Sequence, residues 1–251
     1  MFIATKLHHR QAKLMPLNNR FNIKMNILLS NNFETKLGTI ETWIENNLND
    51  SNTINKNNLL TTASHKIILQ SFQLPNEFQS NSYSPPKKVE SLIGWRWFVE
   101  KINDADEQLS IFCQLINPQA DVSCNPDSGE ALDAVEIENK TYHLHIGTED
   151  SEILRSRANF NDLMPKRFEN LLGLRCDENS CSEYSFTEYI DFGFKTNIPK
   201  LLKGEKIYFH FLVATNPIKP SLENSKYSDV LTWLAVEHSK KYLDKYLKDS
   251  E

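Results

Sequence analysis

The segment Ile207 to Ala214 constrains the fold more than any other part of the sequence, because its residues are almost entirely apolar. A strand that is apolar on both faces must lie inside a sheet that is covered above and below. The preceding segment, residues 190–195, alternates between apolar and polar residues, as a half-buried strand does. The two segments together predict a mainly β protein with a hydrophobic core, in which His210 is an ionisable residue on an otherwise apolar strand.

Length and composition restrict the class of protein further. A chain of 251 residues can form one large domain without disulfide or metal support. Its seven glycines are scattered and form neither of the glycine-rich motifs that bind nucleotide phosphates, so a Rossmann or P-loop site is not expected. Residues 1–33 hold five basic and no acidic residues, so the remainder carries a net charge of −10, which disfavours nucleic-acid binding.

The N-terminal segment is treated separately from the fold. Residues 1–24 are interpreted as a basic extension, either disordered or the product of a start site upstream of Met25, and the alternative is an organellar transit peptide. No apolar run is long enough for a membrane span, and no secretory signal is recognisable. We therefore expect a single β-rich domain over 25–251 in the cytoplasm, or in an organellar matrix if the transit peptide is real. Four cysteines in such a chain predict free thiols in a reducing compartment.

Hydrophobic periodicity predicts the elements of this domain. Helices are expected at 35–49, in an insertion near 149–173, and after Ser239, with a linker at 76–90 and a polar loop at 117–130. Residues 229–237 fit either a strand or a helix. Strands are expected at 65–74, 92–102, 109–116, 134–138, 141–146, 190–195 and 207–214, with hairpins joining 92–102 to 109–116 and 134–138 to 141–146. This order favours an antiparallel β-sandwich or an open barrel.

One stretch carries a family resemblance. The residues IDFGF at 190–194, IPKLLKGE at 198–205 and KIYFHFLV at 206–213 follow one another directly. This order resembles the strand, "IPxxLLxGE", strand unit of DOMON-like and family 9-like carbohydrate-binding β-sandwich modules, over about residues 186–215. The resemblance implies a sandwich fold and a binding function, and it transfers no ligand residues.

Histidines on two strands suggest a metal centre. His143 and His145 share one face of a strand, Glu149 follows four residues later, and His210 lies on another strand. Imidazole and carboxylate groups are ligands for divalent metals. The set resembles the HxHxxxE…H pattern of cupins, although the glycines of that pattern are absent. The alternative is that both histidines of the first strand face solvent or a neighbouring layer.

A basic segment interrupts the acidic part of the chain. It consists of Arg155, Arg157, Lys166, Arg167 and Arg175. Arginines that cluster near helix starts can bind a carboxylate, a phosphate or an acidic partner. The alternative is a solvated helical face that is paired with nearby acidic residues.

The cysteines and tryptophans each allow two interpretations. Cys176 and Cys181 have the spacing of half a zinc knuckle, which Cys124 could join, but free thiols are favoured. Trp95 and Trp97 lie on one face of a strand, where they form either a sugar-stacking platform or part of the core, and the core is favoured.

Acidic residues also gather at 103–108, where Asp104, Asp106 and Glu107 lie in an expected loop. Paired carboxylates can act as acid and base if burial raises one pKa. A loop tip is wet, so a simple turn is favoured over a catalytic pair.

The sequence therefore favours a non-enzymatic β-sandwich protein without a cofactor that binds a protein or a small ligand, with anionic ligands and carbohydrates as candidates. The alternative hypothesis is a cupin-like enzyme that depends on a divalent metal held by the histidine and glutamate set. The two hypotheses differ in whether those four side chains converge on one point.

Overall fold

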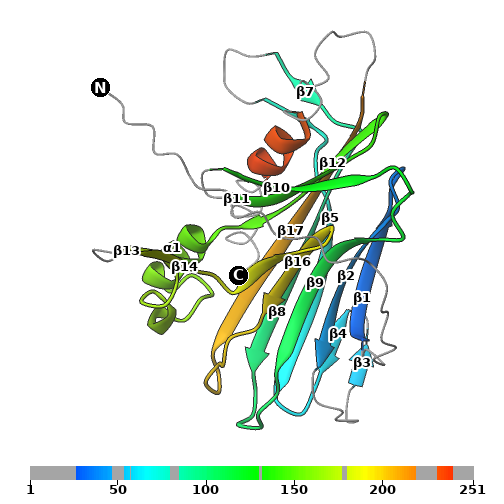
Figure 1. Cartoon of the computed structure of the whole chain (residues 1–251). Helices are drawn as coiled ribbons and strands as arrows, with labels where there is room; N and C mark the ends of the chain where they lie inside the picture. Colours follow the sequence, from blue (N-terminus) through cyan, green and yellow to red (C-terminus); the bar gives the residue numbers. More distant parts are fainter. Residues whose placement is uncertain are drawn as a thin grey trace, which may run out of the picture.

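The computed structural model describes residues 27–46, 54–56, 58–79, 85–129, 132–176, 180–218 and 231–239. Two antiparallel sheets face each other in this part of the chain and form a sandwich (Figure 1). The smaller sheet has the strand order β1-β2-β9-β16-β15. Its strands are β1 (Ile27–Glu34), β2 (Thr39–Asn46), β9 (Leu109–Ile116), β16 (Gly193–Asn197) and β15 (Thr187–Ile190). The predicted mainly β, antiparallel fold is therefore confirmed.

The larger sheet has the strand order β10-β11-β12-β17-β8-β5-β4-β3. Its strands are β10 (Ser123–Gly129), β11 (Leu132–Glu138), β12 (Tyr142–Glu149), β17 (Lys206–Pro217), β8 (Ser91–Lys101), β5 (His65–Gln73), β4 (Leu59–Thr61) and β3 (Ile54–Lys56). The apolar strand β17 lies between β12 and β8, in the centre of this sheet, as its sequence predicts.

The core fills the space between the two inner faces. Phe209, Phe211 and Val213 of β17 point into it, and the ring of Phe211 stacks 6.5 Å from that of Phe194 in the smaller sheet. Trp97 Nε1 donates a hydrogen bond of 2.8 Å to Thr42 Oγ1 across the same interface. Both partners are completely buried, so this bond satisfies two polar groups and fixes the two sheets against each other.

The outer face of the larger sheet is also covered, which explains why β17 is apolar on both sides. Helix α1 (Ser151–Phe160) lies over it, and so does the helix at 231–239 (Figure 1). A Cβ atom added to Gly147 would lie 2.3 Å from Val236 Cγ1, so the absent side chain lets this second helix pack closely on the sheet.

Short elements complete the described structure. The insertion contains α1 and the 3-10 turn η1 (Lys166–Phe168), and it ends where β13 (Gly173–Cys176) begins, as predicted. Strand β13 pairs with β14 (Cys181–Tyr184), and β6 (Glu77–Phe78) pairs with β7 (Lys87–Lys88) within the predicted linker. Residues 1–24 and the segment after Ser239 lie outside the described residues.

The helix predicted at 35–49 is wrong, because its described part contains the strand β2. Ile40, Thr42 and Ile44 are all completely buried on the inner face. A spacing of four residues fits one face of a strand as well as one face of a helix, so the pattern alone could not separate them. Pairing with β1 and β9 on either side decides in favour of the strand.

Three further expectations are corrected. Strands β8 and β9 belong to different sheets rather than to one hairpin, so residues 102–108 cross from one layer to the other. The strand expected at 190–195 is broken at Asp191 and Phe192, which form the turn between β15 and β16; Phe192 has a φ of 60°. The expected loop at 117–130 contains β10, which pairs along its length with β11.

Candidate functional site

A row of polar side chains crosses the outer face of the larger sheet. Gln70 of β5 is paired with Arg96 of β8, and Arg96 is paired with His210 of β17. His210 Nδ1 lies 3.6 Å from Glu149 Oε2 at the end of β12. Arg96, His210 and Glu149 are 3%, 0% and 2% exposed, so two charged groups and an imidazole are held away from water.

Arg157 of α1 neutralises one end of this row. Its Nη1 donates hydrogen bonds to Glu149 Oε2 at 2.6 Å and to the Tyr208 carbonyl at 3.1 Å, and its guanidinium lies 3.4 Å from the centre of the Tyr208 ring. Nη2 donates to the Leu163 carbonyl at 3.1 Å. Arg157 therefore fastens the end of α1 and the following loop onto the sheet.

The loop after α1 is held in an unusual backbone conformation. Asp150 caps the start of α1 by accepting a hydrogen bond from the Ile153 amide at 2.8 Å, and Asn161 ends the helix with a φ of 54°. Leu163 has a φ of 41°, a region that a leucine rarely occupies. Its half-buried side chain is thereby directed to the outer face of the sheet, where it lines a pocket.

Arg96 is the least satisfied charged group in the row. Its Nε and Nη2 donate to Gln70 Oε1 at 3.0 and 2.5 Å, and its guanidinium lies 4.4 Å from the centre of the Phe98 ring. Within the described part of the chain, Nη1 has no hydrogen-bond partner and no carboxylate forms an ion pair with the guanidinium. Desolvation lowers the pKa of Arg96 to about 10, so the group is still protonated at neutral pH.

A pocket of about 320 Å³ lies beside Arg96. Arg96 and Gln70 form its polar end, and apolar side chains line its walls. The wall residues include Ile68, Phe98 and Leu163. The exposed Lys66 and Lys206 also line the pocket, together with Glu100, whose Oε1 lies 3.9 Å from Lys206 Nζ. The volume lies in the range of small-molecule sites, which combine apolar walls with a few polar groups.

The four side chains of the predicted metal centre fall into three separate groups. His143 lies near Glu136 and Glu138, whereas His145 Nε2 lies 3.3 Å from Asp127 Oδ2. His210 and Glu149 contact each other. Within the described residues, these four side chains do not form a group whose donor atoms all lie within 4.8 Å of one another, because the strand register places His210 beside Glu149 at one end of β12 and leaves His143 at the other end.

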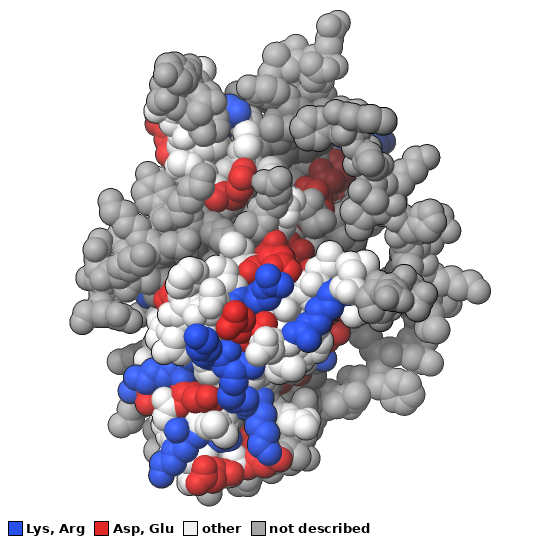
Figure 2. Space-filling view, turned by 90° about the vertical axis from the view of Figure 1, so that its left-hand side faces the viewer, with Lys and Arg blue, Asp and Glu red and all other residues white. Residues whose placement is uncertain are grey.

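The basic segment is likewise divided among different environments. Arg157 is buried in the row just described, Arg155 pairs with Glu152 at 3.5 Å, and Arg167 binds Glu205 through two bonds of 3.0 and 2.7 Å. Lys166 and Arg175 are exposed. Lysines and arginines alternate with acidic residues on this side of the molecule (Figure 2), so the segment forms no uniform basic patch there.

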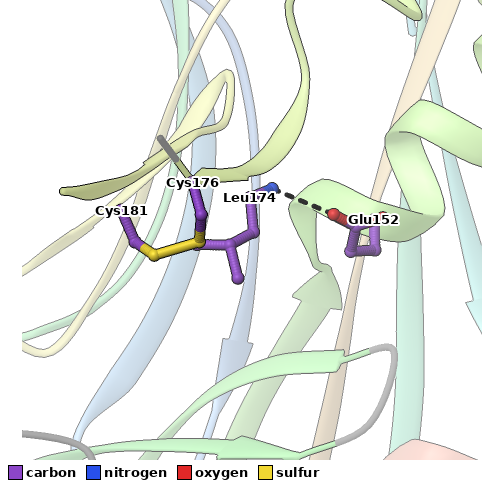
Figure 3. Close-up of a disulfide and its surroundings, with 4 residues drawn as sticks. All are labelled: Glu152, Leu174, Cys176 and Cys181. Atoms are coloured by element: carbon purple, nitrogen blue, oxygen red, sulfur yellow. Dashed lines mark hydrogen bonds between the residues drawn. A yellow bond between two sulfur atoms is a disulfide. The ribbon is translucent and has the colours of Figure 1, made fainter. Parts of the chain in front are cut away.

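Cys176 and Cys181 form a disulfide between β13 and β14, where they are directly paired in register (Figure 3). The hairpin is tied to α1 by a hydrogen bond of 2.9 Å from the Leu174 amide to Glu152 Oε1. Cys113 and Cys124 are free. The expectation of four free thiols is therefore wrong, and the cysteines no longer support a reducing compartment.

Trp95 and Trp97 are 1% and 0% exposed, so they belong to the core and form no sugar-stacking platform. Their positions on the inner face of β8 leave the even-numbered residues, including Arg96, on the outer face. The sequence contained a partial signal for Arg96, because alternation with the two tryptophans places it on the outer face of β8, but its burial depends on the elements that cover that face.

A second buried polar cluster surrounds Glu107, which the sequence placed in an exposed turn. The side chain of Glu107, expected in a wet turn, is 3% exposed and accepts hydrogen bonds from Thr62 Oγ1 at 2.5 Å, from Ser64 Oγ, and from the Ser64 amide at 3.2 Å. His65 Nδ1 lies 3.1 Å from the same carboxylate oxygen. Desolvation raises the pKa of Glu107, but the bonds from Ser64, Thr62 and His65 outweigh it and the pKa is lowered.

This cluster lines a pocket of about 400 Å³, but its geometry is not that of a catalytic triad. Ser64 Oγ and Glu107 Oε2 both approach Nδ1 of His65, at 2.7 and 3.1 Å. A triad needs the serine and the acid on different ring nitrogens. The cluster is therefore interpreted as a structural clamp between β5 and the crossing segment.

None of the helices in the described part of the chain has the length and apolar character that a membrane crossing requires. The resemblance to DOMON-like modules stays a prediction. A scan against protein-family models, a search of curated proteins and a search of solved structures each gave no match to this chain.

Proposed function

We propose that this protein is a non-enzymatic binding protein that takes a small organic anion into the pocket beside Arg96. The observation that carries the proposal is Nη1 of Arg96, which is buried and has no hydrogen-bond partner among the described residues. A buried charged donor without a partner costs free energy, and an anion that accepts its hydrogen bond would remove that cost.

Charge favours an anionic ligand over a neutral one. Two arginines and one glutamate are buried on this face, and Arg157 already neutralises Glu149 at 2.6 Å. The positive charge of Arg96 is left without a counter-ion in the described residues. A carboxylate placed at Nη1 would restore neutrality in a region where solvent screens charge poorly.

The walls define the rest of the ligand. Ile68, Phe98 and Leu163 offer apolar surface, and the two lysines that line the pocket are exposed. A molecule with a carboxylate at one end and an aliphatic or aromatic body matches a pocket with a cationic end and apolar walls. An inorganic anion lacks the apolar body, and an alcohol with the same chain length as the carboxylate lacks the charge, so both should bind more weakly.

Calorimetric titration with octanoate, 1-octanol and sulfate tests the proposal. Octanoate is expected to bind with the highest affinity, because it alone satisfies both the guanidinium and the apolar walls. Arg96→Met should weaken octanoate binding about 10- to 100-fold, the value of one charge-assisted hydrogen bond.

Arg155→Gln is the matched control, since it removes one arginine charge at an exposed position outside the pocket. It should leave the octanoate affinity within about twofold. Equal affinity for octanoate in wild type and Arg96→Met, or no detectable octanoate binding to the wild type, would contradict the proposal.

A further inference from the structure

The hairpin of β11 and β12 carries a second set of ligand-type side chains on the outer face of the sheet. Glu138 is paired in register with His143, and Glu136 is paired with His145. Directly opposite side chains of an antiparallel pair lie close enough to share a partner. Two glutamates and two histidines therefore occupy neighbouring positions on one small surface.

Three of these side chains lie close enough to hold one ion. One donor atom each from Glu136, Glu138 and His143 lies within 4.8 Å of the other two. His143 Nε2 is 3.0 Å from Glu138 Oε2, and Nδ1 is 3.6 Å from Glu136 Oε1. A histidine binds an ion through one ring nitrogen, so one glutamate side chain must rotate towards the nitrogen that the other glutamate already faces before all three donors reach metal-ligand distance.

The histidine of this group is buried, whereas the two glutamates are partly exposed to solvent. The His143 side chain is 1% exposed, whereas those of Glu136 and Glu138 are 22% and 36% exposed. A buried imidazole cannot turn away freely, while the half-exposed carboxylates can close over an ion that arrives from solvent. This asymmetry suits a site of three protein ligands with one position left for water.

The negative charge of the neighbouring carboxylates also favours the binding of a cation. Asp127 of β10 adds a third carboxylate, 3.3 Å from His145 Nε2. Within the described part of the chain, neither Asp127 nor Glu138 forms an ion pair with a lysine or arginine. Neighbouring carboxylates repel one another, and a bound divalent ion would offset that repulsion.

We propose that Glu136, Glu138 and His143 bind a divalent transition-metal ion such as Zn²⁺. Mixed imidazole and carboxylate donors suit zinc better than magnesium or calcium, which prefer oxygen donors alone. The site is independent of the Arg96 pocket, because it shares no residue with that pocket. It retains His143 from the metal centre predicted from sequence and replaces the other ligands with two glutamates of the neighbouring strand.

Zinc titration of the full chain, followed by calorimetry and by metal analysis after dialysis, tests this proposal. The wild type should retain one Zn²⁺ per chain at neutral pH. His143→Gln and Glu138→Gln should each weaken zinc binding at least about tenfold. Glu138→Gln is the decisive variant, since it keeps the shape of a partly exposed side chain and should leave the thermal unfolding of the metal-free protein unchanged.

His8→Gln with His9→Gln is the control, because two adjacent N-terminal histidines can bind zinc adventitiously. That double variant should still retain one Zn²⁺. The proposal is overturned if the wild type retains no zinc, if the N-terminal variant loses it, or if Glu138→Gln binds zinc as the wild type does.

Discussion

Glu107 and Arg96 are both charged groups buried in this protein, but their surroundings differ. Four protein donors, from Thr62, Ser64 and His65, surround one carboxylate oxygen of Glu107. Arg96 has a single hydrogen-bonding partner, Gln70, and one nitrogen that no described residue satisfies. A satisfied buried charge acts as scaffold, whereas an unsatisfied one beside a cavity has the properties of a binding site.

Removing the satisfied charge should have the largest effect. Glu107→Ala leaves several buried donors without an acceptor, so we expect the free energy of unfolding to fall by about 3–5 kcal/mol. Urea unfolding monitored by circular dichroism measures this. Asp104→Ala, an exposed change in the same loop, should cost under about 0.5 kcal/mol. Similar losses in both variants would show that the Glu107 cluster is not a clamp.

Removing the charge of Arg96 should raise the free energy of unfolding, whereas removing that of Glu107 should lower it. Arg96→Met fills a similar volume without a charge, so the ligand-free variant is expected to gain about 1–2 kcal/mol in urea unfolding. The same substitution weakens octanoate binding, which separates function from stability at one position. A loss of about 3 kcal/mol instead would make Arg96 a structural residue like Glu107.

A half-buried carboxylate, that of Asp133, extends the comparison through the pH dependence of stability. Asp133 of β11 accepts a hydrogen bond of 3.0 Å from the Tyr189 hydroxyl, and desolvation raises its pKa to about 6 despite that bond. The unfolded chain releases this proton near pH 4, so between about pH 4 and 6 the folded state holds it more tightly. The stability contributed by Asp133 is therefore full below about pH 4 and falls as pH rises through 6.

Comparison with Asp133→Asn isolates this effect. From pH 7 to pH 5 the wild type should gain about 1 kcal/mol in free energy of unfolding relative to the variant. Glu107, whose pKa is lowered, behaves oppositely and loses its contribution on acidification. Parallel pH profiles for wild type and Asp133→Asn would contradict this assignment.

Sequence periodicity predicted the sandwich because its central strands are unambiguous. The apolar run of β17 had to be covered on both faces, and the hairpin of β11 and β12 followed from two alternating segments. Periodicity failed for β2, whose buried isoleucines fit either repeat, and for the pairing of β8, which depends on contacts between distant segments.

The candidate site was harder to predict, because it too depends on pairing between strands that lie far apart in the sequence. Alternation with its two tryptophan neighbours places Arg96 on the outer face of β8, but the sequence did not reveal its burial. Its partner Gln70 lies 26 residues away on a strand whose pairing the sequence did not reveal either. Glu136 and Glu138 alternate on a predicted strand opposite the two histidines. Their position opposite the histidines follows from the pairing of the two strands in the predicted hairpin.

The disulfide should have the smallest effect on either region. Cys176 and Cys181 lie on an exposed hairpin and line neither the Arg96 pocket nor the pocket beside Glu107. Reduction with a phosphine reagent should release two additional thiols and leave octanoate affinity unchanged within about twofold. A larger change would connect this hairpin to the pocket through α1, to which Glu152 fastens it.

A crystal structure of the complex with 4-iodobenzoate tests the central claim most directly, because anomalous scattering locates the iodine independently of the protein phases. We expect the carboxylate at about 2.7–2.9 Å from Nη1 of Arg96, with the iodinated ring between Phe98 and Leu163. Iodine density elsewhere, with Nη1 bonded to a protein group, would contradict the account.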